Sequence, residues 1–395
     1  MFVRPAYLVA VVASVVTFGC VGRVYSSPTL APLPWPTDTV QTRVIADGVT
    51  QRYVYSPRGP WAVQVLDVDL ARCNAAVSVK GLGSAPSGAA GRVRTTELLR
   101  GLSEQTQVIG GVNADFFSLA APLGVPVGAL VVDGIVVAGP GDQSVLAVDS
   151  AGVPRITMLH VNGTLTTAGR TLPVTNWNRV ARGGIAFLDA HYAPRTDTAS
   201  GVIEVIVTGR NPSRVIDVDT LTLGVGIPAD GGVIIAGPNA PAAARAALRS
   251  LVAGDTVRVD VALSPLHPRD AVGGRPWLIR DGVVNASIDS GGPASFNVGR
   301  NPRTAAGLAD NGRRLILAVV DGRQKPYSDG MSLRELATLM TALGARDAIN
   351  LDGGGSTTLV FADPDTRALR IANRPSDKEG ERAVGDALAI VKRCR

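Results

Sequence analysis

The sequence has few of the residues on which thiol and imidazole chemistry depends, with three cysteines and three histidines among 395 residues. The cysteines, Cys20, Cys73 and Cys394, form no closely spaced pair, and the histidines are equally dispersed. A thiolate zinc site, a redox dithiol and a histidine-based catalytic triad therefore have no support in the sequence. Any chemistry must come from carboxylates, arginines, asparagines and backbone groups.

Lysine and aromatic residues are also scarce. Only four of the 39 basic residues are lysines, aromatics make up 4% of the chain, and the arginines are dispersed rather than gathered in runs. Nucleic-acid-binding proteins concentrate basic charge and interleave it with aromatics for stacking. The pattern disfavours a nucleic-acid partner and favours a small anionic substrate, because guanidinium groups bind phosphate and carboxylate in a bidentate manner.

The residues that are abundant indicate a folded, turn-rich protein. Hydrophobic residues make up 46% of the chain and charged residues 18%, which excludes a largely disordered chain. The 45 glycines and 26 prolines fit many short strands joined by tight turns better than a helical bundle. We therefore expect an α+β fold, a strand-rich mixed sheet with few helices.

The N-terminus has the layout of an export signal. Arg4 precedes an uncharged, apolar stretch that is short for a membrane span, and small residues follow it. We expect a signal peptide over residues 1–27, with a lipoprotein-type signal at Cys20 and a retained anchor as alternatives. A proline-rich linker over residues 28–40 is expected next. The predicted mature protein has no integral membrane span and is secreted or held in the cell envelope, periplasmic or extracellular.

Residues 41–395 are predicted to form one domain, in which residues 150–265 are a β-rich inserted portion. Two Asp-Gly pairs, at residues 133–134 and 281–282, lie between apolar runs and predict two-residue hairpin turns. In an oxidising compartment, a disulfide between Cys73 and Cys394 would tether the C-terminus to the N-terminal region. The alternative is two unrelated thiols.

The last third of the sequence predicts a strand, a helix and a strand. The helix begins at Ser332, whose capping box is completed by Glu335, and each strand is followed by an aspartate, Asp321 or Asp352. If the strands are parallel and neighbouring, both carboxylates face one cleft at the same sheet edge. The loop at residues 353–355 is all glycine, which lets backbone amides approach a ligand closely. A tight turn with an exposed aspartate is the alternative reading of this loop.

Five sequence blocks resemble, in order, the signature motifs of the phosphodiester glycosidase family. The resemblance spans about residues 48–391 with a ragged middle. The blocks are Val112-Asn113-Ala114-Asp115-Phe116-Phe117, Pro302-Arg303-Thr304-Ala305-Ala306-Gly307, Val320-Asp321-Gly322-Arg323-Gln324, Asn350-Leu351-Asp352-Gly353-Gly354-Gly355-Ser356-Thr357, and Asn373-Arg374-Pro375-Ser376 followed by Glu381-Arg382. The chain lacks the cysteine-rich modules and C-terminal membrane segment of the animal members, so the resemblance covers the catalytic-type domain only.

The resemblance implies hydrolysis of the α-glycosidic bond of a sugar-1-phosphodiester, of the N-acetylglucosamine type, to free sugar and a phosphomonoester. Such a reaction needs a carboxylate at the anomeric carbon and cations at the phosphoryl oxygens. The expected catalytic residues are Asp352, Asp321, Arg303 and Arg323. The expected substrate-binding residues are Asn113, Asp115, Gly353, Gly354, Gly355, Ser356, Thr357 and Arg374. Phe116 and Phe117 are candidates either for an apolar wall beside a sugar ring or for the core.

Two other functions remain open on the sequence. One is a glycosidase or phosphodiesterase acting on another phosphorylated glycan, and the other is a non-catalytic glycan-binding envelope protein. The sequence requires no cofactor, although Asp321, Asp352 and the carbonyls of the glycine loop are oxygen ligands of the kind that Ca²⁺ or Mg²⁺ prefers. The expected partner is a phosphorylated glycan or sugar-1-phosphodiester, and the oligomeric state is not indicated.

Overall fold

The computed structural model describes residues 33–81, 91–120, 122–141, 143–167, 169–179, 183–196, 200–209, 211–220 and 224–393. The predicted signal at residues 1–27 with Cys20, the first part of the predicted linker, and Cys394 lie outside these described residues. The later part of the linker contacts the domain, because the rings of Trp35 and Trp61 meet edge to face with centroids 4.9 Å apart. Within the described residues, no helix is long and apolar enough to cross a membrane.

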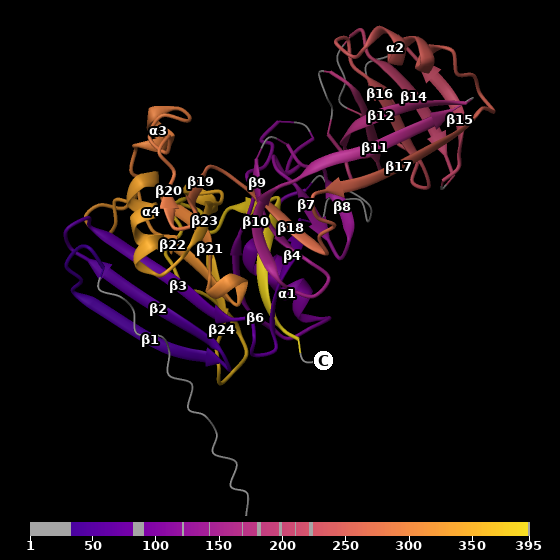
Figure 1. The fold of residues 1–395 in the computed structure, drawn as a ribbon. Coiled ribbons are helices and arrows are strands. Elements are labelled where there is room, and N and C mark those ends of the chain that lie inside the picture. Colours follow the sequence, from indigo (N-terminus) through magenta and orange to yellow (C-terminus); the bar gives the residue numbers. More distant parts are fainter. Residues whose placement is uncertain are drawn as a thin grey trace, which may run out of the picture.

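The largest sheet has eight strands and carries the predicted strand, helix and strand (Figure 1). In sheet order its members are β1 (Thr39–Ala46), β2 (Val49–Ser56), β3 (Trp61–Asp69), β22 (Arg314–Val320), β21 (Arg303–Ala309), β23 (Asp347–Asn350), β19 (Trp277–Arg280) and β20 (Val283–Val284). The helix α4 (Leu333–Ala342) packs against one face of this sheet through Leu336 and Met340, which are fully buried. The capping box of Ser332 and Glu335 is present as predicted.

A second sheet has five strands and covers the other side of the main core. Its strands are β25 (Leu369–Ile371), β24 (Leu359–Ala362), β6 (Val108–Asn113), β27 (Asp386–Lys392) and β4 (Asn74–Lys80), with a small pair formed by β26 (Ala383–Val384) and β5 (Val93–Arg94) and the helix α1 (Thr95–Ser103). Apolar side chains from both sheets, including Leu66, Val112, Leu317 and Leu388, form one buried cluster. The two sheets are therefore held together by a shared core.

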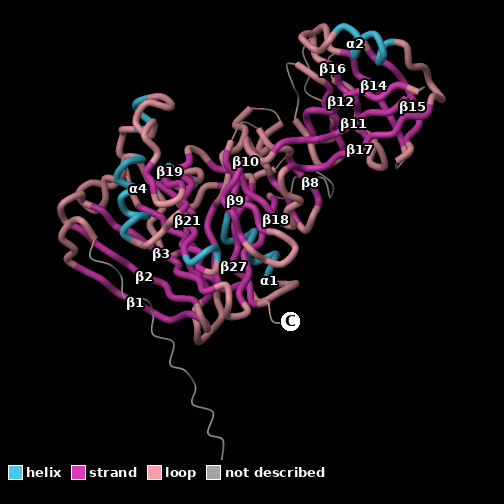
Figure 2. The backbone as a smooth tube through the Cα atoms, in the orientation of Figure 1, coloured by secondary structure: helices cyan, strands magenta, loops and turns pink. Residues whose placement is uncertain are grey.

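A third sheet lies beside this core and leads into a separate barrel. The sheet consists of β10 (Pro154–Met158), β9 (Ser144–Val148), β18 (Asp270–Gly274), β7 (Leu130–Val132) and β8 (Ile135–Ala138). The closed barrel consists of β11 (His160–Thr167), β12 (Arg170–Trp177), β13 (Ile185–Asp189), β16 (Gly232–Ala236), β14 (Ile203–Thr208), β15 (Ser213–Asp219) and β17 (Thr256–Ser264), with the helix α2 (Ala242–Arg249). Figures 1 and 2 show the barrel projecting from the rest of the molecule, joined to it by β11 and β17. It overlaps the portion predicted at residues 150–265 and has its own apolar core.

The predicted α+β class is confirmed, and strands far outnumber helices in the described residues (Figure 2). Both Asp-Gly hairpins are also confirmed. Asp133 and Gly134 join β7 to β8, and Asp281 and Gly282 join β19 to β20, all four with φ between 48° and 82°. These values are those of the two-residue turn that matches strand twist.

The predicted strand neighbours are wrong in one respect. The strands β22 and β23 are parallel but not adjacent, because β21 lies between them and is antiparallel to both. The carboxyl ends of β22 and β23 still meet at one sheet edge, and the first residue of β21 lies there too. Asp321, Asp352 and Arg303 are therefore brought to the same edge.

The predicted disulfide stays a prediction, since one of its cysteines is not described. Cys73 is exposed and immediately precedes β4. Its carbonyl accepts a hydrogen bond of 2.6 Å from the amide of Arg393, which follows β27.

Candidate active site

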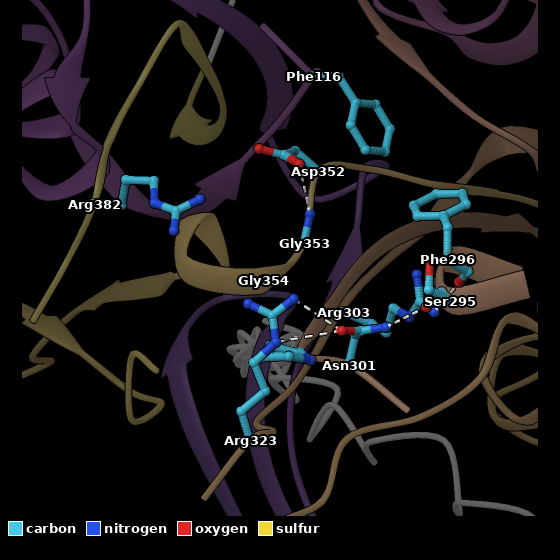
Figure 3. A pocket seen from close by; sticks show the side chains of 11 residues that line it. Phe116, Ser295, Phe296, Asn301, Arg303, Arg323, Asp352, Gly353, Gly354 and Arg382 are labelled. Atoms are coloured by element: carbon cyan, nitrogen blue, oxygen red, sulfur yellow. Dashed lines mark hydrogen bonds between the residues drawn. The ribbon is translucent and has the colours of Figure 1, made fainter. Parts of the chain in front are cut away.

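A cavity of about 360 Å³ opens at the sheet edge where β21 begins and β23 ends (Figure 3). It is lined by segments that are far apart in the sequence. The lining residues are Phe116, Ser295, Phe296, Asn301, Pro302, Arg303, Arg323, Asp352, Gly353, Gly354 and Arg382. Among them are one carboxylate and three guanidinium groups, so the described lining carries more positive than negative charge.

Asp352 is the carboxylate, and its backbone is fixed on both sides. Its amide donates to the carbonyl of Ala114 at 2.8 Å, and its own carbonyl accepts from Asn113 Nδ2 at 2.7 Å. Its carboxylate oxygen Oδ1 accepts from the amide of Gly353 at 2.9 Å. The first sequence block, at residues 112–117, therefore positions the catalytic candidate Asp352.

Burial raises the pKa of Asp352 to about 6. The Ser356 hydroxyl, the Gly353 amide, and the charges of Arg382 and Arg275 oppose this rise without cancelling it. A carboxylate with such a pKa is mostly ionised at neutral pH but binds a proton more readily than a solvated aspartate. That property suits a base or a nucleophile working near neutrality.

Arg303 lies at the start of β21 and is 1% exposed. Its Nε donates to the carbonyl of Met331 at 2.8 Å, and its Nη2 donates to the carbonyls of Gly299, at 3.0 Å, and Phe296. Burial and the nearby charge of Arg323 lower its pKa to about 10, so it stays protonated at neutral pH. Because its hydrogen bonds go to carbonyls and not to a carboxylate, its charge remains available to an anion in the cavity.

The other two arginines differ in how their charge is held. Arg323 has a positive φ of 59° and donates to Asn301 Oδ1 at 2.8 Å through Nη2. Arg382 makes a two-point ion pair with Asp377, at 2.8 and 3.1 Å. In Figure 3 the Gly353–Gly354 segment lies between these two guanidinium groups. Among the described residues, Arg303 and Arg323 form no ion pair with a carboxylate, and they line the same cavity as Asp352.

The glycine loop at residues 353–355 needs glycine for steric reasons as well as for backbone freedom. A Cβ on Gly355 would lie 2.2 Å from Asp377 Oδ1 and 2.3 Å from Arg382 Nη2. Any side chain there would push the ion pair away from the loop. Gly353 and Gly354 line the cavity, whereas Gly355, Ser356 and Thr357 do not and the last two are buried behind it. Of the five residues predicted to bind substrate in this segment, Gly353 and Gly354 are the two that line the cavity.

Asp321 is at the predicted strand end, but its carboxylate faces away from the cavity. It is 1% exposed and accepts hydrogen bonds of 3.0 Å from Asn373 Nδ2, the Arg374 amide and the Tyr327 hydroxyl. Burial raises its pKa. The catalytic role of Asp321 stays a prediction; in the structure its oxygens hold the loop at residues 373–374 against β22.

Arg374, a predicted substrate-binding residue, also lies outside the cavity lining. Its side chain is exposed, its guanidinium lies 5.5 Å from the centroid of the Tyr327 ring, and it does not line the cavity. Its contribution comes from its backbone amide, which donates to Asp321. A predicted phosphate ligand is therefore a loop residue outside the cavity.

Asn113 and Asp115 are buried next to the site and do not line the cavity. Asn113 is fully buried, and its Oδ1 accepts from the Thr304 hydroxyl at 2.8 Å and the Thr358 amide at 3.0 Å. Asp115 accepts from the amides of Phe116 and Gly128. Their predicted substrate contacts therefore stay predictions.

Two phenylalanines form the apolar side of the cavity. Phe116 and Phe296 meet edge to face with ring centroids 5.9 Å apart, and the Arg275 guanidinium lies 5.2 Å from the Phe116 centroid. Phe117 instead packs against the buried Val384. Phe116 is therefore part of the apolar wall of the cavity, whereas Phe117 packs against the core.

The described residues contain no group of three or more histidine, cysteine, aspartate or glutamate side chains arranged to hold a metal ion. Of the two carboxylates named as possible cation ligands, Asp352 lines the cavity and Asp321 does not. Both carboxylate oxygens of Asp321 already accept hydrogen bonds from the protein.

A family model described as phosphodiester glycosidase matches residues 201–391. These residues carry a phosphodiester glycosidase domain. The predicted family resemblance is confirmed over this range, which includes Arg303, Arg323, Asp352 and Arg382. The first predicted block, at residues 112–117, lies outside the match.

Solved structures share the fold of the phosphodiester glycosidase domain and of most of the chain. A hypothetical protein from Synechocystis aligns with a TM-score of 0.72 and 24% identity, over 90% of this chain and 64% of that one. This chain thus spans less than two thirds of the length of the Synechocystis protein. A Burkholderia pseudomallei K96243 protein, described as a candidate exported protein, aligns with a TM-score of 0.64 and 27% identity, over 84% of this chain and 74% of that one.

The catalytic domain of zebrafish N-acetylglucosamine-1-phosphodiester alpha-N-acetylglucosaminidase, auto-inhibited by its pro-peptide, aligns more loosely. The TM-score is 0.45 and the identity 15%, over 93% of this chain and 86% of that one. No curated protein matches the chain by sequence.

The cavity of the phosphodiester glycosidase domain includes residues that sequence reasoning missed. Arg382 was within a recognised block but was not singled out, and Phe296 and Asn301 had no motif of their own. A signal for Asn301 was its position just before Pro302-Arg303. Nothing in the local pattern marked Phe296, because the loop that carries it reaches the cavity only through the fold.

Asp321→Asn in this domain is expected to lower the free energy of unfolding by about 2–3 kcal/mol, because the amide cannot accept all of the hydrogen bonds that end on the buried carboxylate. Activity per folded molecule should fall far less than for a change at Asp352. Chemical denaturation and assays on the purified variant measure both effects. An unchanged unfolding curve together with complete inactivity would contradict the positioning role.

A group of buried acids behind the cavity links stability to pH. The Asp115 amide donates to Asp386 Oδ1 at 2.7 Å. Burial raises the pKa of Asp115 to about 7 and also raises the pKa of Asp386, and the charge of Asp352 adds to both. The folded protein therefore holds protons that the unfolded chain, with ordinary aspartates, releases at lower pH.

Because these pKa values are raised, their stabilising effect is full below about pH 4 and is lost as the pH rises through about 6–7. We expect the free energy of unfolding to fall by at least about 1–2 kcal/mol between about pH 4.5 and about pH 8. Urea denaturation at a series of pH values measures this. Asp386→Asn should flatten the curve, and a free energy of unfolding that rises steadily over this range would count against the buried-acid account.

Proposed function

We propose that the protein hydrolyses the glycosidic bond between the anomeric carbon of a sugar and a phosphodiester, releasing free sugar and a phosphomonoester. The observation that carries the proposal is the cavity in which Asp352, with its raised pKa, faces the unpaired guanidinium groups of Arg303 and Arg323. The phosphodiester glycosidase domain at residues 201–391 supports the reaction class. The N-acetylglucosamine type of sugar is part of the proposal.

The arginines supply what this reaction needs at the leaving group. As the bond between the anomeric carbon and the phosphoryl oxygen breaks, negative charge grows on the phosphate, and fixed guanidinium groups stabilise that charge. A phosphate is a good leaving group, so a strong general acid is not needed as it is for an ordinary glycoside. Arg303 is held by three carbonyls before substrate arrives, which keeps its reorganisation during the reaction small.

Asp352 supplies what the reaction needs at the sugar. Two routes remain: it takes a proton from the attacking water, or it attacks the anomeric carbon and forms a glycosyl-enzyme that water then hydrolyses. In both, the oxygen of water ends on the sugar and the electron pair of the broken bond ends on the phosphate. The first route inverts the anomeric configuration and the second retains it, so proton NMR of the released sugar distinguishes them.

The deciding experiment is incubation of the purified protein with an α-N-acetylglucosamine 1-phosphodiester in ¹⁸O-labelled water, with and without a chelator. We expect free sugar carrying the label and unlabelled phosphomonoester. Label in phosphate together with release of sugar phosphate would reassign the protein as a phosphodiesterase. Unchanged substrate beside measurable glycan affinity would favour the non-catalytic glycan-binding alternative. Loss of activity with the chelator, restored by Ca²⁺ or Mg²⁺, would add a cation to the mechanism.

We also propose that the protein acts outside the cytoplasm, either secreted or in the cell envelope. The apolar stretch near the N-terminus and the exported-protein description of the Burkholderia relative support this placement. N-terminal sequencing of the protein recovered from culture medium and from membranes distinguishes signal cleavage from lipid attachment at Cys20. Recovery of the uncleaved chain from the cytoplasm would contradict export.

A further inference from the structure

A second cavity, of about 670 Å³, adjoins the first, and Phe116 and Phe296 line both. Its lining carries fewer charged side chains than that of the first cavity. Arg275 is the one charged residue among those described as lining it, and the others are apolar side chains, amides, hydroxyls and glycines. A volume of this size is typical of a small-molecule site.

Two residues that line this cavity each carry a buried polar atom with no hydrogen-bond partner in the part of the chain that the structure describes. These atoms are Gln143 Oε1 and Trp277 Nε1. Gln143 is 9% exposed. A buried donor or acceptor without a partner is costly, so a ligand that brings hydroxyl groups to this wall would gain from pairing with both atoms.

The remaining lining fits a sugar ring better than an ion or a hydrocarbon. Phe116, Phe296 and Trp277 offer aromatic surface for the apolar face of a ring, while Asn285 and Ser287 offer polar groups for its hydroxyls. With Arg275 as its one charged residue among those described as lining it, this cavity compensates a phosphate less fully than the first. The first cavity has the opposite composition, with three guanidinium groups.

Asp352 lines the first cavity and is influenced by a residue of the second. The Arg275 guanidinium of the second cavity is close enough for its charge to oppose the raised pKa of Asp352. Arg275 also lies over the face of Phe116, the ring common to both cavities. A ligand that spans the aromatic pair would therefore pass the carboxylate.

We propose that the second cavity is the subsite for the neutral sugar ring of the substrate, and that the first cavity holds the phosphodiester. This inference rests on the proposed function and deepens it by assigning an orientation. The anomeric carbon then lies between the two cavities, beside Asp352, and the leaving phosphate lies among the arginines. Gln143 and Trp277 are the specificity-determining residues for the sugar.

The test is a ligand-observed NMR titration with N-acetylglucosamine, glucose and inorganic phosphate as separate probes. Wild type is compared with Gln143→Leu and Trp277→Phe, which remove one polar partner each while keeping most of the side-chain volume. We expect each variant to bind N-acetylglucosamine or glucose about fivefold to tenfold more weakly and to bind phosphate as the wild type does. Arg323→Ala is the matched comparison and should weaken phosphate binding and leave sugar binding unchanged. Circular dichroism verifies that each variant is folded, and either cavity variant alone suffices for the test.

The outcomes separate the subsite from the reaction. Sugar binding that is lost in Arg323→Ala but unchanged in both cavity variants overturns the subsite, as does the absence of binding by either sugar. Sugar binding that depends on Gln143 and Trp277 in a protein that releases no sugar from the phosphodiester supports the subsite and overturns the proposed function. Hydrolysis with a KM unchanged in both variants overturns the subsite alone.

Discussion

Asp352→Asn is expected to lower kcat on a sugar-1-phosphodiester by at least about a thousandfold while leaving the protein folded. The amide can still accept from Gly353, and the backbone bonds to Ala114 and Asn113 do not involve the side chain. What is lost is the negative charge and the lone pair that would take a proton or attack the anomeric carbon. Release of sugar from the variant and from wild type, at matched concentrations of folded protein, measures the effect.

The matched control is Asp133→Asn, which makes the same chemical change in an exposed hairpin turn whose positive φ asparagine tolerates. It should retain wild-type activity. In wild type, activity should rise with pH through about 6 as Asp352 loses its proton. Turnover by Asp352→Asn at the wild-type rate, or a wild-type profile that falls through this range, would remove Asp352 from the mechanism.

Arg303→Lys is expected to lower kcat/KM by about a hundredfold to a thousandfold, even though the charge is conserved. A lysine ammonium cannot reproduce the fork that reaches the carbonyls of Met331, Phe296 and Gly299. Leaving buried carbonyls without donors should also lower the free energy of unfolding by about 2–4 kcal/mol. Steady-state kinetics and chemical denaturation of the same preparation separate the two losses.

Arg334→Lys is the control for this change, because Arg334 is exposed and pairs with Asp289 at the surface. Surface ion pairs of this kind contribute little, so both its activity and its stability should match wild type. If Arg303→Lys kept full activity on the phosphodiester, a structural cation would explain the geometry equally well and the phosphate-binding role would be abandoned.

Asp352 and Asp321 show how far sequence reasoning reaches. Both follow an apolar strand, and the pattern correctly indicated that β22 and β23 end at one sheet edge. The direction of each side chain depended on a different partner. Asp321 is turned away by Asn373 and the Arg374 amide, which come from a loop much later in the chain. Such a non-local contact leaves no trace in the spacing of residues around Asp321.

The order of the strands in the sheet was the other feature that the sequence pattern could not predict. Periodicity identified β22, α4 and β23, but β21, which precedes all three in the chain, inserts between the two strands. That choice is made by packing of both sheet faces and not by local propensity. The same limit applies to Arg382, whose ion pair with Asp377 is local but whose place in the cavity depends on the tight fit against Gly355.

The attachment of the barrel has a consequence for how such proteins can diversify. The chain leaves the body of the molecule on β11 and returns on β17, and these strands pair from His160 opposite Ser264 onward. Entry and exit therefore lie side by side, between β10 and β18 of the third sheet. Evolution can lengthen or shorten the far end of the barrel as one cassette, but the turn after β12 must be inherited with the body, because Arg179 donates to the carbonyl of Gly128 at 3.2 Å and its charge opposes the raised pKa of Asp115.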